Sequence, residues 1–460
     1  MTVSLQQAME EAGGAMDYVR TIDSHANSNH LKFFADVPQQ TTNWRQEQQA
    51  WADSVAVADL SHHMYDLHVE GPDALQLFAD LGVNDFSNVR PGKAKQFVAC
   101  SPDGYLIGDG ILFCLDDDSY TLVGYGPINW VKYHAETGDY DVTYSEDPHG
   151  GVREGPPETF RYQVQGPDAL AVIEEVIDGD LPDIGFFNFG EVSIAGHDVN
   201  ALRHGMMNEA GYEFFGPWDV QGDVLDTIMD AGADYGIERI GAMAYPTNVI
   251  PAAWMSVPLP AIFHDGMEDY REWLGADEFE GALTIAGSLD SEDVTDHYLT
   301  PVGAGHDRLV DLDHDFVGRD AVAEQMDADA KEKVTLVWDR ESTKQLTDNL
   351  FEDAPARRYP TLPMPEWALT QNDLVLKDGE QVGVANNTRY LYFERNMFSL
   401  CAIDAEYAEP GTEVTVVWGQ AGETGNPRVE EHVQTEITAT VAPAPYFEDK
   451  RKTADYTAAN

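Results

Sequence analysis

The stretches YDLHVEGPDALQLFADLG (residues 65–82) and FRYQVQGPDALAVIEEV (residues 160–176) share one pattern, and this pattern decides the predicted fold. Each begins with alternating apolar and polar residues, as expected of a half-buried strand, and continues into a run with the spacing of a helix. A Gly-Pro turn joins the two parts, and proline suits the first turn of a helix. The shared GPDAL segments begin at Gly71 and Gly166, 95 residues apart. The sequence therefore predicts an internal repeat of strand, turn and helix.

The repeat predicts two similar α/β halves that share one core, with copies near residues 51–150 and 158–250. Beside the first copy, residues 46–60 (QEQQAWADSVAVADL) are expected to form a helix. Residues 104–126 contain two apolar runs around an acidic turn and predict a hairpin. Residues 220–237 (VQGDVLDTIMDAGADYGI) predict an amphipathic helix that ends at a glycine.

The last part of the chain has a different pattern. Short β-rich runs such as KVTLVWD, SLCAIDA and TEVTVVWG are separated by turn signals, and DGEQ at residues 378–381 predicts a hairpin turn. Residues 255–305 carry little periodic pattern and are interpreted as an insertion. The predicted fold class is α+β, with two pseudo-repeated halves in residues 1–330 and a small β-barrel in residues 331–460.

The chain is strongly acidic along its whole length. It has 82 Asp and Glu against 27 Lys and Arg, which gives a net charge of −55. The acids occur in short groups and not in one block, which favours a surface adapted to high salt over a polyanionic tail or a cation-binding domain. High salt screens the repulsion among such charges. Because no basic stripe is present to neutralise phosphates, we expect no nucleic acid partner.

Several other classes of protein are not indicated. The chain has no GxxxxGK[ST], GxGxxG, HExxH or GxSxG motif. Cys100, Cys114 and Cys401 are odd in number and form no CxxC, so neither a disulfide framework nor a zinc cluster is predicted. His62 and His63 would point to opposite faces of a strand, so we expect no metal site. Without a signal-like N-terminus or a run of ~20 apolar residues, we expect no membrane association and a cytoplasmic location.

Three segments in order along the chain resemble the aminomethyltransferase family, which includes the T-protein of the glycine cleavage system. They are VQGPDAL (164–170), GYE (211–213) and HDFVGRDA (314–321). Further segments resemble the tetrahydrofolate-dependent O-demethylases of vanillate and syringate: NWRQEQQAW, SHHMYDL, PGKAKQ, GYLIGDGILF, NWVKYHAETGDY, LRHGM, AYPTN, PLPAIF and APAPY. This resemblance covers nearly the whole chain. It implies a T-protein-like folate-binding fold, tetrahydrofolate as the cofactor, and transfer of a methyl group from a small methoxy donor to its N5.

The resemblance also implies roles for single residues. Tyr245, in GAMAYPTN, matches the catalytic tyrosine of the demethylases and would protonate the departing aryl oxygen, because its usual pKa of ~10 is close to that of a phenol. Glu213 would accept the N–H groups of the pterin ring, which a carboxylate can do with both oxygens. Gln165, Trp254 and Tyr212, the neighbour of Glu213, would also bind the cofactor. The alternative for Tyr245 is a buried structural tyrosine, and for Glu213 a solvated acid.

The donor pocket and a second catalytic residue follow from the same resemblance. His63 matches a substrate-pocket histidine and Phe34 stands where the vanillate-type enzymes have a tyrosine. Tyr125 stands where those enzymes carry an arginine, and a tyrosine cannot make the bidentate ion pair of a guanidinium with a carboxylate. This change favours a neutral or phenolic methoxy compound as an alternative donor. Asp109, in GDG, matches an aspartate that assists transfer in T-proteins, although a turn residue is the alternative.

Two other functions stay open from the sequence. A glycine-cleavage aminomethyltransferase would take an aminomethyl group from a lipoyl carrier protein. Against it, HGMMNEAGYE and RIGAMAY replace the GYTGE-like and arginine-containing runs of T-proteins. A non-catalytic folate-binding regulatory protein is the third hypothesis, and the presence of Tyr245 and Glu213 argues against it.

Overall fold

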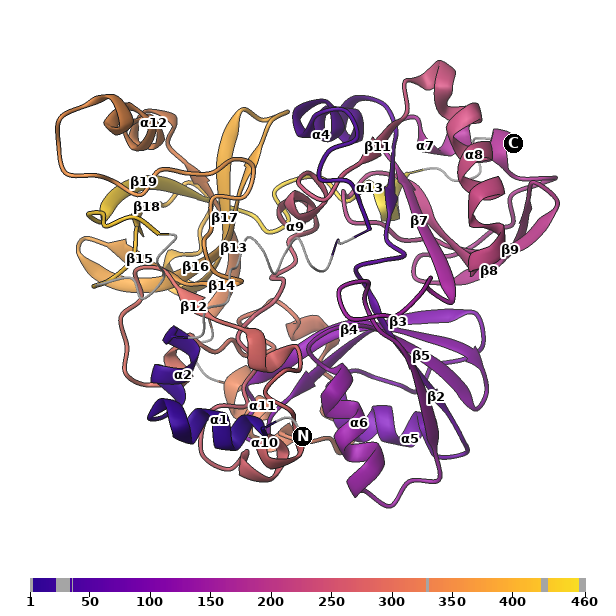
Figure 1. Ribbon diagram of the computed structural model, residues 1–460, viewed down its shortest axis with the longest axis horizontal. Coiled ribbons are helices and arrows are strands. Elements are labelled where there is room, and N and C mark those ends of the chain that lie inside the picture. Colours follow the sequence, from indigo (N-terminus) through magenta and orange to yellow (C-terminus); the bar gives the residue numbers. More distant parts are fainter. Residues whose placement is uncertain (1–2, 22–33, 35, 328–330, 423–428, 455–460) are drawn as a thin grey trace.

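The computed structural model describes residues 3–21, 34, 36–327, 331–422 and 429–454 (Figure 1). Two β-sheets and a closed β-barrel surround the centre of the molecule, and short helices cover their outer faces. This arrangement confirms the predicted α+β class with two similar halves and a C-terminal barrel.

The first half is a five-stranded sheet in the order β3-β4-β5-β2-β6. Its strands are β2 (Tyr65–Glu70), β3 (Lys93–Cys100), β4 (Leu106–Asp116), β5 (Ser119–Gly124) and β6 (Thr143–Asp147). β4 and β5 pair antiparallel across a short acidic turn, so the predicted hairpin is confirmed. Helices α5 (Ala74–Leu81) and α6 (Ile128–Thr137) pack against this sheet.

The second half is a six-stranded sheet in the order β11-β1-β7-β10-β9-β8. Its strands are β1 (Ala56–Asp59), β7 (Thr159–Gln165), β8 (Phe189–Ile194), β9 (His197–Leu202), β10 (Gly211–Pro217) and β11 (Glu238–Ile240). Helices α7 (Ala169–Val176) and α8 (Gln221–Gly232) pack against each other and share a hydrophobic core with this sheet. A 3₁₀ turn follows α8 and ends at a left-handed glycine, Gly236, as predicted.

The glycines of the near-repeat are required for the same reason in both copies. Gly71 and Gly166 have φ angles of +142° and +141°. A Cβ atom would lie 2.2 Å from the carbonyl oxygen of Asp141 at the first position, and 2.4 Å from that of Ser54 at the second. Only a residue without a side chain allows this close approach of two backbones.

The predicted helix over residues 46–60 is wrong in its second half. Helix α4 (Trp44–Asp53) ends at Asp53, and strand β1 follows it. β1 pairs parallel with β11 and antiparallel with β7, so it completes the sheet of the other half. The β-branched, fully buried side chains of Val55 and Val57 suit a strand between two neighbours better than a helix.

The C-terminal part is a closed barrel in the order β13-β17-β16-β15-β18-β19. Its strands are β13 (Lys331–Trp338), β15 (Asp373–Lys377), β16 (Glu380–Leu391), β17 (Asn396–Asp404), β18 (Glu413–Trp418) and β19 (Thr435–Ala442), and α12 (Arg340–Asp348) packs beside β19. Asp378 and Gly379, both with positive φ, form the two-residue turn that DGEQ predicted. The domain boundary at 330 and 331 stays a prediction.

Residues 241–327 connect the second sheet to the barrel, and the interpretation of residues 255–305 as an insertion stays a prediction. This region packs on the N-terminal helices, where the Leu5 amide donates to Leu274 O at 2.8 Å. It also contributes β12 (Ile285–Ala286), which pairs with β14 (Thr370–Gln371) beside the barrel. Its α-helices and those of the two termini are α1 (Leu5–Ala12), α2 (Ala15–Thr21), α9 (Val249–Ala252), α10 (Glu268–Trp273), α11 (Arg319–Asp327) and α13 (Lys450–Thr453).

Single 3₁₀ turns complete the secondary structure. They are η1 (Trp218–Val220), η2 (Ala233–Tyr235), η3 (Tyr245–Asn248), η4 (Glu280–Ala282), η5 (Val294–His297), η6 (Asp307–Leu309), η7 (Asn349–Phe351) and η8 (Ala405–Tyr407). Within the described ranges, no helix has both the length and the apolar character needed to cross a membrane.

Candidate active site

A cavity of about 1190 Å³ lies where the two sheets, the connecting region and the barrel meet. Its lining includes Tyr245 from the turn η3 after β11, Asp109 from β4, Glu213 from β10 and Arg389 from β16. Typical small-molecule sites measure ~300–1,000 Å³, so this cavity has room for two reacting molecules. Because the two sheets, the connecting region and the barrel all contribute residues, the cavity exists only when these parts are assembled.

Tyr245 lies at the start of η3 and faces an aromatic group. Its ring centroid is 5.0 Å from that of His63 and 5.9 Å from that of Phe34. Phe34 and His63 stack on each other at 4.5 Å. Burial, with a smaller effect of the Glu213 charge, raises the pKa of Tyr245 far above its usual value. The phenol is therefore protonated at neutral pH and can donate a hydrogen bond.

Tyr125 follows β5 and forms another part of the cavity wall. Its ring stacks on Phe279 at 4.9 Å and lies 5.8 Å from His149. Burial raises its pKa well above the usual value. The three residues predicted to bind the donor, His63, Phe34 and Tyr125, thus all line the cavity that contains Tyr245.

Glu213 is buried in the cavity wall beside a cation. Arg161 Nη1 lies 3.2 Å from its carboxylate, and Nη2 of the same guanidinium lies 2.9 Å from Asp66. Arg161 also lies over the rings of Phe113 and Phe215. Burial raises the pKa of Glu213, while Arg161 acts in the opposite direction and favours the carboxylate.

Gln165 and Tyr212, both predicted to bind the cofactor, do not belong to the cavity lining. The Gln165 side chain accepts from the Met207 amide at 3.0 Å and donates to Glu209 O at 2.7 Å, so it supports the loop before β10. Tyr212 lies in the hydrophobic core of the second half. Successive residues of a strand point to opposite faces, so Tyr212 points away when Glu213 faces the cavity.

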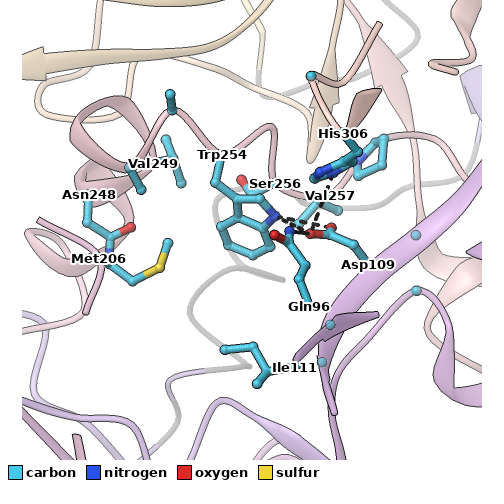
Figure 2. A pocket seen from close by; sticks show the side chains of 18 of the residues that line it. Gln96, Asp109, Ile111, Met206, Asn248, Val249, Trp254, Ser256, Val257 and His306 are labelled. Carbon is cyan, nitrogen blue, oxygen red and sulfur yellow. Dashed lines mark hydrogen bonds and ion pairs between the residues drawn. The ribbon is translucent and has the colours of Figure 1, made fainter. Parts of the chain in front are cut away.

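Asp109 lies in the wall formed by the five-stranded sheet and is the centre of a polar group (Figure 2). Gln96 Nε2 donates to it at 2.6 Å, and Trp254 Nε1 donates at 2.9 Å. His306 Nε2 lies 3.8 Å away. Burial raises the pKa of Asp109 to about 6, while these donors and the charge of Lys333 lower it. This carboxyl group can therefore take up or release a proton near neutral pH.

Of the two basic groups near Asp109, His306 is buried and Lys333 is half-buried. Burial lowers the pKa of His306 to about 3, so this ring is neutral. Burial also lowers the pKa of Lys333 to about 8, and Asp109 opposes this shift. In the described residues, no group of three or more His, Cys, Asp or Glu could hold a metal ion. His62 and His63 lie in a turn and not in a strand, and only His63 lines the cavity.

Reasoning from the sequence missed several residues of this site. Arg161 had a local signal, because Arg161, Gln163 and Gln165 give β7 one polar face in a strand that is otherwise apolar and buried. His306, Lys333 and Arg389 had no such signal. They lie far along the chain from the segments that they contact, so only the folded arrangement brings them to the cavity.

Comparisons with known proteins place these observations in a family. Residues 13–255 match the model of the GCVT N-terminal domain. A syringate O-demethylase from Sphingobium sp. is 39% identical over 97% of this chain and 96% of its own length. A sesamin methylene transferase from Sinomonas sp. is 29% identical over 84% of each chain, and an aminomethyltransferase from Bacillus subtilis is 25% identical over 83% of this chain and 88% of its own.

A solved structure has the same fold. The glycine cleavage system aminomethyltransferase T from Bartonella henselae covers 90% of this chain and 92% of its own with a TM-score of 0.59. Its sequence identity is 16%, so this likeness bears on the fold alone.

Proposed function

Since the chain belongs to the family of the GCVT N-terminal domain, we propose that it is a tetrahydrofolate-dependent O-demethylase, which moves a methyl group from an aryl methoxy donor to N5 of tetrahydrofolate. The observation that carries this proposal is one cavity that joins a buried, protonated Tyr245 to the buried acid Glu213. The likeness to the syringate O-demethylase over nearly the full length supports the same reaction class. A cytoplasmic location is part of the proposal.

The residues present fit a folate. The cavity exceeds the volume of a usual single-ligand site, which leaves room for a donor beside the cofactor. Glu213 offers a buried carboxylate to N–H groups of a pterin ring, and Trp254 offers an aromatic wall. Gln165 and Tyr212 lie behind this lining, so we do not include them among the binding residues.

Tetrahydrofolate supplies the nucleophilic nitrogen when it is bound. His63 and Phe34 hold the aryl ring of the donor, because they form a stacked pair next to the Tyr245 ring. The protonated Tyr245 donates a hydrogen bond to the departing aryl oxygen, and such a positioned donor contributes about 10²–10³-fold. Asp109, with its pKa near 6, can accept the proton that the nitrogen loses. No metal is needed for these roles.

The experiment is an incubation at high salt with tetrahydrofolate and a panel of donors. Syringate, a neutral methoxyphenol and a methylenedioxy compound would be compared, and 5-methyltetrahydrofolate would be measured. We expect 5-methyltetrahydrofolate from at least one methoxy donor. Formation of 5,10-methylenetetrahydrofolate alone, with a lipoylated carrier protein, would overturn the proposal in favour of an aminomethyltransferase.

The role of Tyr245 has its own test. Y245F should lower kcat by about 10²–10³-fold, because the leaving oxygen loses its hydrogen-bond donor. Y162F is a matched control, since the buried Tyr162 hydroxyl donates to Gln221 at 2.7 Å outside the cavity. Full turnover by Y245F would exclude this tyrosine as the donor.

A further inference from the structure

Tyr245 and Trp254, at the two ends of one segment, both line the cavity. The barrel makes a hydrogen bond near each end of this segment. Pro246 directly follows Tyr245, and its carbonyl accepts a hydrogen bond from Arg389 Nε at 3.1 Å. Ala253 directly precedes Trp254, and its carbonyl accepts a hydrogen bond from Lys333 Nζ at 2.7 Å. Both donors are cations of barrel strands, in a chain that has few cations.

We propose that the barrel positions the catalytic segment through these two cations, Arg389 for Tyr245 and Lys333 for Trp254. The inference deepens the proposed function, since it assigns positioning residues to the same site. Neither residue is required to touch a substrate for this role.

Arg389 lies on β16 and is held rigidly. Its Nη1 pairs with Glu366 and also donates to Thr388 O at 2.8 Å. Glu366 in turn accepts from the Thr388 amide at 2.7 Å. Arg389 is only 7% exposed, so its bond to Pro246 does not compete with bulk water. A guanidinium fixed on three sides determines where the turn η3 lies.

Lys333 lies on β13, with its side chain on the outside of the barrel, because the alternate residues Val334 and Leu336 belong to the barrel core. A Cβ atom at Gly305 would come within 2.3 Å of Lys333 Cε, so the loop at Gly305 packs directly on the lysine chain. The charge of Lys333 also faces Asp109 and Asp307.

This arrangement makes Lys333 the cation that acts on Asp109. The polar groups that face Asp109 in the described part of the chain are Gln96, Trp254, His306 and Lys333. Gln96 and Trp254 are uncharged donors, and burial keeps His306 neutral. Removal of the Lys333 charge should therefore raise the pKa of Asp109. The indole N–H of Trp254 binds this carboxylate, so Trp254 emission reports its protonation.

A fluorescence titration without any ligand tests the lysine. The Trp254 signal is the difference between the wild type and W254F, recorded at high salt from pH 5 to 8. We expect a transition near pH 6 in the wild type, loss of it in D109N, and a shift of about one pH unit upward in K333M. K333R should keep the wild-type midpoint.

A matched control removes another lysine of the barrel. Lys377 Nζ donates to Glu413 O at 2.7 Å, but this exposed bond stays within the barrel, and K377M should leave the midpoint unchanged. An unchanged midpoint in K333M, or a transition that persists in D109N, would overturn the assignment of Lys333. The fluorescence titration needs no methyl transfer, so its result is independent of the proposed function.

Arg389 requires a variant that leaves no unpaired buried charge. R389M/E366Q removes both charges, while Gln can still accept from the Thr388 amide. We expect faster hydrogen–deuterium exchange in a peptide that spans residues 241–256, without ligand. We also expect kcat to fall about 10- to 100-fold, with KM for tetrahydrofolate nearly unchanged, since a small misplacement of a catalytic group has this effect. R389K should restore part of the rate.

The control is another ion pair of the C-terminal part, between the buried Arg358 and the half-buried Glu430, at 2.6 Å. R358M/E430Q should reduce stability without changing exchange at residues 241–256 or kcat. Equal effects of the two double variants would mean that Arg389 only stabilises the barrel, and unchanged exchange in R389M/E366Q would also overturn its positioning role. If the wild type lacked methyl transfer, the exchange measurement would still decide this inference.

Discussion

Each of the two sheets supplies one wall of the cavity with a buried carboxylate, and the two carboxylates have different partners. Glu213, from the six-stranded sheet, has the Arg161 guanidinium at 3.2 Å. Asp109, from the five-stranded sheet, has the uncharged donors Gln96 and Trp254 in contact, and its cation, Lys333, acts from further away. Both acids are at least nine-tenths buried.

The difference teaches that burial alone does not set the state of an acid. Burial raises the pKa of Glu213, but the contacting Arg161 favours its carboxylate form and offsets part of the lost hydration. At Asp109, the neutral donors Gln96 and Trp254 offset only part of the effect of burial. The pKa of Asp109 therefore rises to about 6, and its proton becomes available for exchange. In the proposed function, Glu213 serves binding of the cofactor and Asp109 serves proton transfer.

The largest effect should come from removal of the cation in the first wall. Arg161 pairs with two buried acids, Asp66 and Glu213, so R161M leaves two uncompensated charges. We expect a loss of about 3–5 kcal/mol in the free energy of unfolding, measured by denaturant titration at constant salt. R153M is a sharper comparison, because Arg153 pairs with only one buried acid, Asp147. An equal loss in the two variants would contradict the two-acid account.

A smaller effect is expected for the binding wall itself. E213Q keeps the shape of the side chain and leaves Arg161 paired with Asp66, so the fold should persist. The Kd for tetrahydrofolate should rise about 10- to 100-fold, since a hydrogen bond to a charged group contributes about 1.5–3 kcal/mol. Isothermal titration calorimetry would measure it. A Kd within twofold of the wild type would exclude Glu213 from the binding site.

The smallest effect concerns stability against pH in the second wall. The pKa of Asp109 is raised when the protein is folded, so its ionisation opposes folding, and stability is lost as the pH rises through about 6. D109N removes this cost, so its stability advantage over the wild type should grow by about 1–2 kcal/mol between pH 5 and pH 8. The difference should shrink towards pH 5, measured by denaturant titration at each pH. A gain that is equal at both values would show that Asp109 does not titrate there.

How much of the fold and the site could be predicted from the sequence depends on whether the interactions are local or join distant parts of the chain. The near-repeat was readable because strand alternation, the Gly-Pro turn and helix spacing are local. Strand β1 could not be predicted in this way, because residues 56–59 form a strand by pairing with β7 and β11, which are far along the chain. Tyr245, Glu213, His63, Phe34, Tyr125, Asp109 and Trp254 were predicted from family resemblance and all line one cavity. Strand alternation alone could have warned that Tyr212 points away from Glu213.

The sequence by itself determined the repeated α/β halves, the barrel and the family, because these depend on local patterns and on motifs in order. Only the tertiary structure decided that Lys333 and Arg389 of the barrel hold the segment that carries Tyr245 and Trp254. It also decided which acid has a cation in contact and which titrates near neutral pH. The physical reason is that a pKa and a hydrogen-bond partner depend on neighbours in space, and here those neighbours come from three separate parts of the chain.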